Sequence, residues 1–462
     1  MCFAKIYTFV ENIKALKRNE NQEKFVALRK EWSVFIYERF EVKTDNGGLE
    51  ATFYFNIDQK HFFAPHIAIP ERPFLDWTKI ERKALETIVF HIGMIELISY
   101  WKTLCPAKVV IKPFALSEPQ MRWWKKLYYN GLGEFFYLNG ITVGEEEFMQ
   151  MESDSERGFS PISLPLDEKT LVPIGGGKDS VVTLELLRRE MPVTPLIVNP
   201  RGATIGCIEA AGFTLDDCLV INRTLDANML KLNAEGCLNG HTPFSAMLAF
   251  VTLLAAAGSG SRYIALSNES SANESTVPGT KINHQYSKSV EFERDFRTYV
   301  ETYVNDKVQY FSFLRPLSEL QIAMLFSRCK NYHAVFRSCN AGSKTDSWCC
   351  RCPKCLFTWI ILSPFLSHDE LVRIFGSDMS NDKDLLPVFE ELNGTAPVKP
   401  FECVGTVGEV RACVDVMNDR EGTIFESSPH PDVALSELLK NFNKENFLPE
   451  RFVDVLKSAL YK

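Results

Sequence analysis

A glycine-rich stretch that ends in charged and hydroxyl residues is the first part of this sequence that could carry chemistry. An apolar run, Leu171–Ile174, leads into three glycines and a Lys-Asp-Ser sequence, namely Gly175, Gly176, Gly177, Lys178, Asp179 and Ser180. Glycines let backbone N–H groups approach an oxyanion, and a helix N-terminus adds a positive dipole end. The stretch therefore predicts a strand, a phosphate-binding loop and a helix. A glycine-rich turn without a ligand is the alternative.

Two common phosphate-binding loops do not fit this stretch. A P-loop has Ser or Thr directly after its lysine, whereas Asp179 follows Lys178. The dinucleotide fingerprint has a final glycine where Ser180 stands. The stretch instead resembles the PP-loop of the ATP pyrophosphatase superfamily, with Gly175 in place of the usual first serine. That resemblance implies binding of ATP, which these enzymes cleave to AMP and pyrophosphate while adenylating a substrate.

A second segment rich in polar side chains follows a predicted strand at 262–268. It covers residues 267–274 and 279–289 and is dense in hydrogen-bonding and titratable groups. Mg²⁺ prefers carboxylates together with phosphate oxygens, so Asp179 and Glu269 are candidate ligands, with Asn268 near the nucleotide. Three further residues are predicted to face an anionic substrate, namely Lys281, His284 and Lys288. A solvated surface loop is the alternative.

Four cysteines in a short span predict a metal site. The chain has thirteen cysteines, and five of them lie between 339 and 355. The spacing of Cys339, Cys349, Cys352 and Cys355 suits tetrahedral Zn²⁺, while Cys350 is expected to point away. Reduced core thiols and an iron–sulfur cluster are the alternatives. Pro353 at a helix start indicates that the cluster caps a buried helix.

Composition limits the class of protein. A length of 462 residues predicts two or three domains, and 45% hydrophobic with 24% charged residues is ordinary for a soluble globular protein. The net charge of −8 argues against a large nucleic-acid footprint. Residues 1–6 lack the pattern of a signal peptide, and the apolar run 243–258 is shorter than the roughly 20 residues that span a bilayer. We expect a cytoplasmic protein with no membrane insertion and no nucleic-acid partner; the oligomeric state stays open.

Hydrophobic patterns predict three domains. Residues 1–165 carry no readable catalytic motif and predict an α+β domain that ends in the polar segment 150–163. Its expected elements are a helix over 11–29, a hairpin of strands 33–42 and 51–57 around a turn at 45–48, and a helix over 77–101. The aromatic residues of 123–129 are expected in the core, and 131–136 is either a structural loop or the lining of a ligand site.

Residues 166–330 alternate β and helical patterns, which predicts a doubly wound parallel α/β sheet. Strands are expected near 168–174, 194–200, 218–223, 262–268 and 308–316, with helices at 203–212, 243–257 and 289–304. Because ligands bind at the carboxyl ends of such strands, Gly175–Ser180, Asn199 and Asn268–Glu269 are predicted to share one edge. Residues 331–462 are expected to hold the cysteine cluster and to be mainly helical, with two amphipathic helices in 435–460.

Several segments together resemble the UDP-N-acetylmuramoyl-L-alanyl-L-glutamate epimerase family of peptidoglycan precursor synthesis. The resemblance spans about 165–410 and rests on 175–180, 267–273, 283–289, 399–405 and the cysteine cluster. It implies a PP-loop fold and ATP- and Mg²⁺-dependent adenylation of the terminal L-Glu of UDP-MurNAc-L-Ala-L-Glu. Inversion at the α-carbon would follow, with release of AMP and pyrophosphate.

Proton exchange at that carbon needs an acid and a base. Adenylation neutralises the carboxylate and so makes the α-proton easier to remove, because nearby cations can stabilise the enolate. The candidate proton carriers are His284, Lys281, Lys288 and Cys403, and His284 comes first because its pKa lies nearest neutral pH. Residues 1–165 are expected to recognise the UDP-sugar end.

Two other functions remain open. The first is another PP-loop adenylating enzyme, such as one like the deazaguanine nitrile synthase of queuosine biosynthesis or a tRNA-modifying enzyme. The second is an ATP-binding regulatory module with structural zinc. Retention of Asp179 and Ser180 favours an enzyme.

Overall fold

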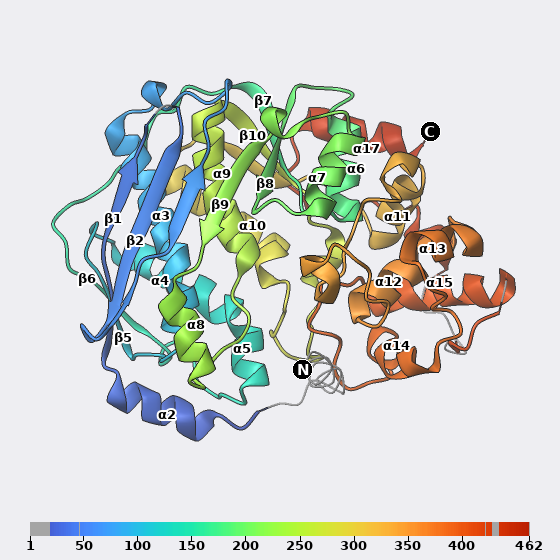
Figure 1. Cartoon of the computed structure of the whole chain (residues 1–462), viewed down its shortest axis with the longest axis horizontal. Coiled ribbons are helices and arrows are strands. Elements are labelled where there is room, and N and C mark those ends of the chain that lie inside the picture. The colour runs from blue at the N-terminus through green and yellow to red at the C-terminus, as the bar shows by residue number, and fades with distance from the viewer. Residues whose placement is uncertain (1–18, 46, 421, 427–433, 462) are drawn as a thin grey trace, which may run out of the picture.

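The computed structural model describes residues 19–45, 47–420, 422–426 and 434–461. Residues 1–18 lie outside this part, and with them the N-terminal hexapeptide and the first part of the helix expected over 11–29. Asn46 of the expected turn also lies outside it. The described chain is an α/β protein in which helices flank a central sheet (Figure 1).

A single sheet of eleven strands runs through the first two thirds of the chain. Its order is β11-β10-β7-β8-β9-β4-β2-β1-β5-β6, and β3 pairs with β2. The strands are β1 Val34–Lys43, β2 Leu49–Ile57, β3 His61–Phe63, β4 His66–Ile69, β5 Lys108–Ile111, β6 Gln150–Ser153, β7 Asp167–Pro173, β8 Val193–Val198, β9 Leu219–Thr224, β10 Ser261–Leu266 and β11 Gln309–Ser312.

Five neighbouring strands, β11, β10, β7, β8 and β9, are all parallel. The chain order reverses at β7, since β8 and β9 continue on one side and β10 and β11 on the other. Successive side chains enter different cores: Leu171 packs with the core on one face and Val172 with that on the other. This arrangement confirms the predicted α/β class with a parallel-rich sheet and creates a switch point between β7 and β10.

Helices cover both faces and build the C-terminal region. In the N-terminal part they are α2 Gln22–Glu31, α3 Arg82–Trp101, α4 Glu118–Gly131, α5 Gly133–Leu138, α6 Lys178–Leu187, α7 Gly202–Ala210, α8 Ala227–Ala234, α9 Phe244–Ser259 and α10 Val290–Tyr303. The C-terminal ones are α11 Glu319–Ser327, α12 Pro353–Leu362, α13 His368–Phe375, α14 Leu386–Leu392, α15 Val407–Arg420, α16 Leu435–Leu438 and α17 Glu450–Leu460. The described residues after 330 contain helices and no strand, which agrees with the mainly helical region expected there.

The antiparallel pairing of β4 with β9 carries the sheet across the boundary expected near residue 165. A buried ion pair lies beside this seam, where Arg223 of β9 donates to Glu96 of α3 at 2.8 Å between Nη2 and Oε2. The Glu96 side chain is only 1% exposed. The expected hairpin of β1 and β2 is also present and joins this sheet.

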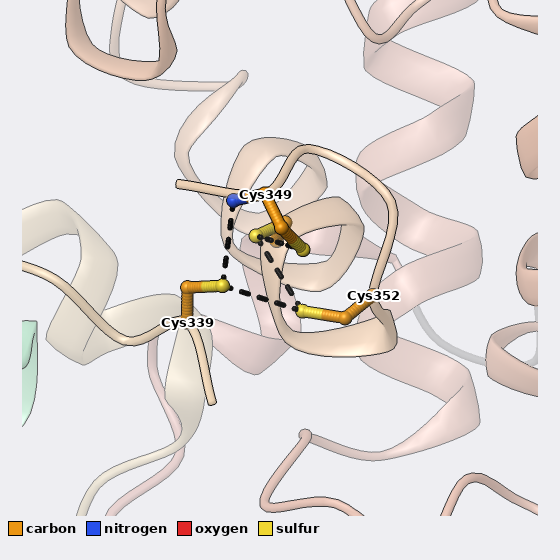
Figure 2. A group of neighbouring side chains, drawn as sticks. Cys339, Cys349 and Cys352 are labelled. Carbon is orange, nitrogen blue, oxygen red and sulfur yellow. Dashed lines mark hydrogen bonds between the residues drawn. The ribbon is translucent and has the colours of Figure 1, made fainter. Parts of the chain in front are cut away.

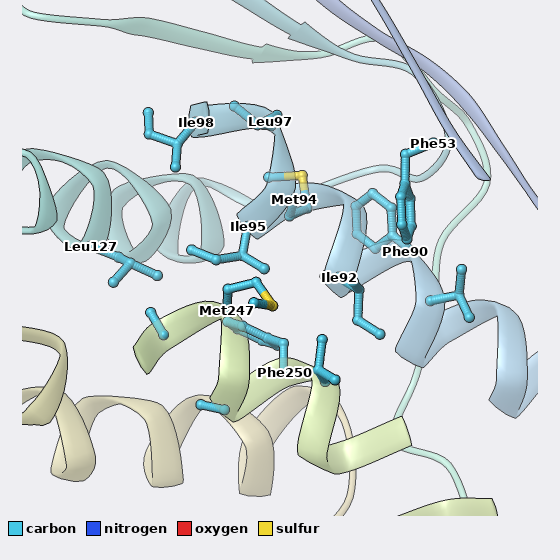
Figure 3. Close-up of a cluster of buried hydrophobic side chains, with 14 of the residues drawn as sticks. Phe53, Phe90, Ile92, Met94, Ile95, Leu97, Ile98, Leu127, Met247 and Phe250 are labelled. Atoms are coloured by element: carbon cyan, nitrogen blue, oxygen red, sulfur yellow. The ribbon is translucent and has the colours of Figure 1, made fainter. Parts of the chain in front are cut away.

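The long helix α3 is a core helix. It is the one described helix long and apolar enough to cross a membrane, but 94% of its most apolar window is buried inside the protein. Figure 3 shows Phe90, Ile95 and other side chains of α3 packed among Leu127 of α4 and Met247 and Phe250 of α9. The aromatic residues expected in the core belong to this layer, since Trp124 and Tyr128 are fully buried.

Candidate functional site

The glycine-rich loop lies between β7 and α6, at the carboxyl edge of the sheet. Gly176 has a φ of 84°, and a Cβ there would lie 3.1 Å from the backbone of Ala203 in α7. Ser338 crowds the next position, because a Cβ on Gly177 would lie 2.8 Å from its Oγ. Gly175 has open space around its Cα. The loop thus requires glycine for backbone conformation and close packing, while its first residue, Gly175, is exposed at the N-terminal end of α6.

Lys178 does not point freely toward solvent. Its ammonium group forms ion pairs with Asp179 and with Glu319 at the start of α11, and its side chain is 4% exposed. Burial opposes the positive charge, but the two carboxylates outweigh it and raise the pKa of Lys178. The sequence did not indicate that Glu319 would pair with Lys178. A ligand phosphate would have to compete with these carboxylates for the lysine, whereas Asp179 is 32% exposed and accessible.

Asn268 and Glu269 follow β10 and lie next to the switch point. Asn268 donates to Ser312 Oγ at 2.9 Å, which leaves its own oxygen for other partners. Glu269 is 4% exposed, and burial raises the pKa of its carboxyl although Lys288 opposes that effect. Among the residues that the structure describes, its carboxylate accepts one hydrogen bond, a long one from Ser271 Oγ at 3.3 Å.

Asn199 makes a structural contact at the sheet edge. Its φ is 50°, and its side chain exchanges two hydrogen bonds with the backbone of Arg223, at 2.7 and 3.0 Å. The side-chain amide therefore joins the ends of β8 and β9. Asn199 shares the sheet edge, as the topology predicted, but its contact with a nucleotide stays a prediction.

Three of the four predicted proton carriers lie together. Lys288 Nζ is 3.1 Å from Cys403 Sγ, and His284 hydrogen-bonds to the same thiol. Burial would raise the pKa of Cys403, but Lys288 and His284 lower it well below its ordinary value. For His284, the hydrogen bonds with Cys403 and Glu134 overcome burial and raise the pKa to about 9. These neighbours favour the thiolate form of Cys403. We call Cys403, His284 and Lys288 the thiolate cluster.

Two residues with no role assigned from the sequence, Glu134 and His241, lie next to His284. Glu134 of α5 accepts from His284 Nδ1 at 2.5 Å and lies 3.7 Å from His241 Nδ1. Burial and the charge on His284 lower the pKa of His241 to about 4. These three residues also converge closely enough to hold a metal ion. However, two ligands of one tetrahedral Zn²⁺ lie about 3.3 Å apart, so the 2.5 Å contact is a hydrogen bond between Glu134 and His284.

The segment 399–405 packs against the polar loop that carries His284. Lys399 N donates to Thr276 O at 3.1 Å, and Gln285 Nε2 donates to Val404 O at 3.4 Å. These contacts fix Cys403 near Lys288 although 115 residues separate the two in the sequence.

Lys281 lies apart from the thiolate cluster. It is exposed and lines a cavity of about 800 Å³ between α4, α5 and the polar loop. Asn283 and Gly133, the neighbours of His284 and Glu134 in the sequence, line the same cavity. Its wall also contains aromatic side chains, namely Tyr129, Phe136, Tyr137 and Tyr286.

The four cysteines form a candidate metal centre. Their sulfur atoms all lie within 4.8 Å of one another, and the distances are 3.9 Å for Cys339–Cys352, 3.7 Å for Cys349–Cys355 and 3.5 Å for Cys352–Cys355. Figure 2 shows the side chains of Cys339, Cys349 and Cys352 turned toward a common point. Tetrahedral Zn²⁺ with Zn–S bonds of about 2.3 Å places sulfurs about 3.8 Å apart. A disulfide would require about 2.05 Å. The geometry therefore suits one four-coordinate metal ion.

The position of Cys350 confirms the expectation that it points away, because its Sγ donates to Phe375 O at 3.4 Å. Cys352 is the N-cap of α12, and Pro353 is the first residue of this buried helix.

Replacing Cys352 with serine is expected to remove the bound metal and to lower the melting temperature, because a structural site needs its fourth ligand. Metal content per chain, measured by plasma mass spectrometry, checks this result. The matched control is Cys350→Ser, which should keep the full metal content. Equal metal content in both variants would contradict the assignment of the ligands.

Comparison with known proteins places these features in one family. Residues 27–313 match the MurL N-terminal domain, and residues 335–428 match the MurL C-terminal domain. The chain is 34% identical over 385 residues to the UDP-N-acetyl-alpha-D-muramoyl-L-alanyl-L-glutamate epimerase of Salinispora tropica, a match that covers 79% of this chain and 83% of that protein.

Two further relatives carry the same name. The protein from Xanthomonas oryzae pv. oryzae is 32% identical over 397 residues, which cover 84% of this chain and 86% of the relative. The protein from a Micromonospora species is 34% identical over 365 residues, with coverage of 77% and 79%. The chain therefore belongs to the MurL family, whose named relatives are UDP-N-acetyl-alpha-D-muramoyl-L-alanyl-L-glutamate epimerases.

Proposed function

We propose that this chain is an ATP- and Mg²⁺-dependent epimerase with a PP-loop. It converts the terminal L-Glu of UDP-MurNAc-L-Ala-L-Glu to D-Glu through an acyl-adenylate and releases AMP and pyrophosphate. One observation carries the proposal: the buried Glu269 carboxyl lies within electrostatic reach both of Asp179 and Lys178 and of Lys288 and Cys403. A loop of the kind that binds phosphate is thus connected through Glu269 to the thiolate cluster, whose side chains can carry protons. The names of the relatives supply the substrate.

The first half of the reaction is adenylation. The accessible backbone at Gly175 and the N-terminus of α6 suit the phosphates of ATP, with Ser180 in the first turn. Asp179 and Glu269 are the residues that would hold Mg²⁺, because Asp179 lies in the first turn after the loop and the Glu269 carboxylate accepts just the long Ser271 bond from the part of the chain that the structure describes. When bound, the ion would offset phosphate charge. The glutamate carboxylate then attacks the α-phosphate, and pyrophosphate leaves.

The second half of the reaction is inversion at the α-carbon. In the adenylate the carboxylate no longer carries its negative charge, so the developing enolate can be stabilised by the ammonium of Lys288 and the imidazolium of His284. The thiolate cluster supplies the groups that remove and return the α-proton. Glu134 holds His284 in its charged form.

The cavity of about 800 Å³ suits the UDP-sugar end of the substrate. Its aromatic wall can contact a uracil ring, and Lys281 at its exposed side can approach the diphosphate. Part of its lining comes from α4 and α5, within the N-terminal region for which the sequence predicted this role.

The pH dependence of kcat/KM tests the charged state of His284. The groups around it are Glu134, His241, Glu402 and Cys403. Because the pKa of His284 is raised to about 9, we expect the rate to stay high below that pH and to fall as the imidazolium loses its proton above it. Replacing Glu134 with glutamine removes a charge that raises this pKa, so the alkaline limb should move down by about 1 pH unit or more.

A surface variant is the control for this profile. Glu118→Gln changes an exposed carboxylate on α4 and should leave the alkaline limb in place. If the alkaline limb of the pH profile is unchanged in Glu134→Gln, the acid–base role assigned to His284 is wrong.

The function itself is tested by incubating the protein with ATP, Mg²⁺ and UDP-MurNAc-L-Ala-L-Glu in deuterated water. Formation of AMP, pyrophosphate and a D-Glu product with deuterium at the α-carbon is the expected result, and an incubation without ATP should give none of them. Formation of AMP without α-deuterium would indicate that the activated group is transferred to another acceptor. No ATP turnover would refute the epimerase and make a deazapurine carboxylate the next substrate to try.

A further inference from the structure

The thiolate cluster contains a stronger nucleophile than proton exchange requires. Cys403 Sγ contacts the ammonium of Lys288 at 3.1 Å and the imidazole of His284, which Glu134 holds from its other side at 2.5 Å. A thiol, an imidazole and a carboxylate in this order form the arrangement that activates nucleophilic cysteines on many folds. Cys403 therefore has the surroundings of a nucleophile in a site where, by the proposed function, an activated acyl group is made.

We propose that Cys403 attacks the glutamyl adenylate and that the α-proton is exchanged while the glutamyl group is held on Cys403 as a thioester. This inference rests on the proposed function, since it needs the acyl-adenylate. It assigns covalent catalysis to a residue that the sequence suggested only as a proton carrier.

Two other buried cysteines, Cys413 and Cys207, lack this environment. Burial raises the pKa of Cys413 well above its ordinary value, and Glu409 and Asp415 add to that effect. Burial likewise raises the pKa of Cys207 to about 12. Cys403 is half-buried, and burial would raise its pKa too, but Lys288, His284 and Lys354 reverse the effect there. A cysteine with only a packing role would not need the contacts with Lys288 and His284.

The proposed step balances without an oxidant or reductant. The sulfur of Cys403 forms a bond to the acyl carbon, the bond from that carbon to the phosphate oxygen of the adenylate breaks, and AMP leaves with the electron pair. After the proton has been exchanged, water adds to the same carbon and the thiolate leaves, which regenerates the carboxylate. The net reaction consumes one ATP and one water and yields AMP and pyrophosphate.

A thioester also helps the proton exchange. Its carbonyl is weakly stabilised by the neighbouring sulfur, so its α-proton is more acidic than that of a carboxylate. Acylation removes the anionic charge of Cys403, which is one of the charges that raise the pKa of His284. His284 can then lose its proton more readily and act as the base, while Lys288 remains a cation beside the enolate.

The experiment is a rapid acid quench of the wild-type protein during turnover with ATP, Mg²⁺ and UDP-MurNAc-L-Ala-L-Glu. Mass spectrometry of the digested protein should find the peptide with Cys403 heavier by the substrate less one water, and hydroxylamine should release this adduct. In parallel, Cys403→Ser should keep ATP–pyrophosphate exchange within about threefold and lose α-deuterium incorporation on the order of 1,000-fold. Cys237→Ser, at a cysteine that is not part of the thiolate cluster, is the matched control and should behave as wild type.

The possible results separate the roles of Cys403. Turnover with α-deuterium but no adduct on wild-type Cys403 would overturn the thioester while leaving the proposed function in place. Deuterium incorporation at the wild-type rate in Cys403→Ser would overturn it as well. Absence of ATP–pyrophosphate exchange in the wild type would refute the proposed function and the thioester together. Trapping on the wild type does not depend on whether a variant folds.

Discussion

Replacing Asp179 with asparagine is expected to lower ATP turnover about 1,000-fold, because a carboxylate that holds a cation against phosphate contributes several kcal/mol to the transition state. Asp179 lies in the first turn of α6, and its side chain is 32% exposed, so the change should cost little stability. Lys178 keeps its second partner, Glu319, in the variant. Pyrophosphate release at saturating ATP is the measurement, together with the melting temperature.

Asp216→Asn provides the control for this variant. Asp216 is an exposed aspartate before β9, and its replacement should leave turnover within about twofold of wild type, as expected of surface changes. Full turnover in Asp179→Asn would exclude this aspartate as a metal ligand and would remove the main support for ATP binding at the loop.

Replacing Arg315 with methionine is expected to destabilise the protein by about 3–5 kcal/mol, the cost of leaving a buried charge without its partner. Arg315 is fully buried and pairs with Glu293, which is 1% exposed, at 3.0 Å. It also donates to the carbonyl of Glu269 at 2.6 Å and to the carbonyl of Lys288. The variant thus loses a charge partner and two backbone contacts next to the site.

Chemical denaturation and the melting temperature measure this loss. The matched control is Arg122→Met, whose partner Glu118 is 83% exposed, and its loss should be below about 1 kcal/mol. Because Arg315 joins the backbone of a candidate metal ligand to that of Lys288, the variant should also lose deuterium exchange at temperatures where it stays folded. Equal stability of the two variants would contradict the role given to Arg315.

The local parts of the fold could be predicted from the sequence. The apolar run before Gly175 and the spacing after Lys178 predicted β7, the loop and α6, and the cysteine spacing predicted the convergence of four sulfurs. These features depend on neighbours in the chain, whose periodicity is visible in one sequence. The shared edge of Gly175 and Glu269 followed from a general rule for parallel sheets.

Contacts between distant segments could not be predicted in this way. Lys178 pairs with Glu319, 141 residues away, and His284 pairs with Glu134, 150 residues away. No periodic pattern connects such residues, because burial of a charge beside its partner depends on the packing of whole helices. The sequence had marked the segment around Glu134 only as a loop or a ligand lining.

The seam between β4 and β9 affects how the chain can fold as it is synthesised. Glu96 leaves the ribosome 127 residues before its partner Arg223. At about 5–20 residues per second, the unpaired carboxylate on α3 waits about 6 to 25 seconds for Arg223, and the free edge of β4, which is synthesised earlier, waits longer for β9. An open strand edge is a template for pairing with other chains. The nascent chain therefore exposes an unpaired strand edge, at which it could pair with other chains, until β9 has been synthesised.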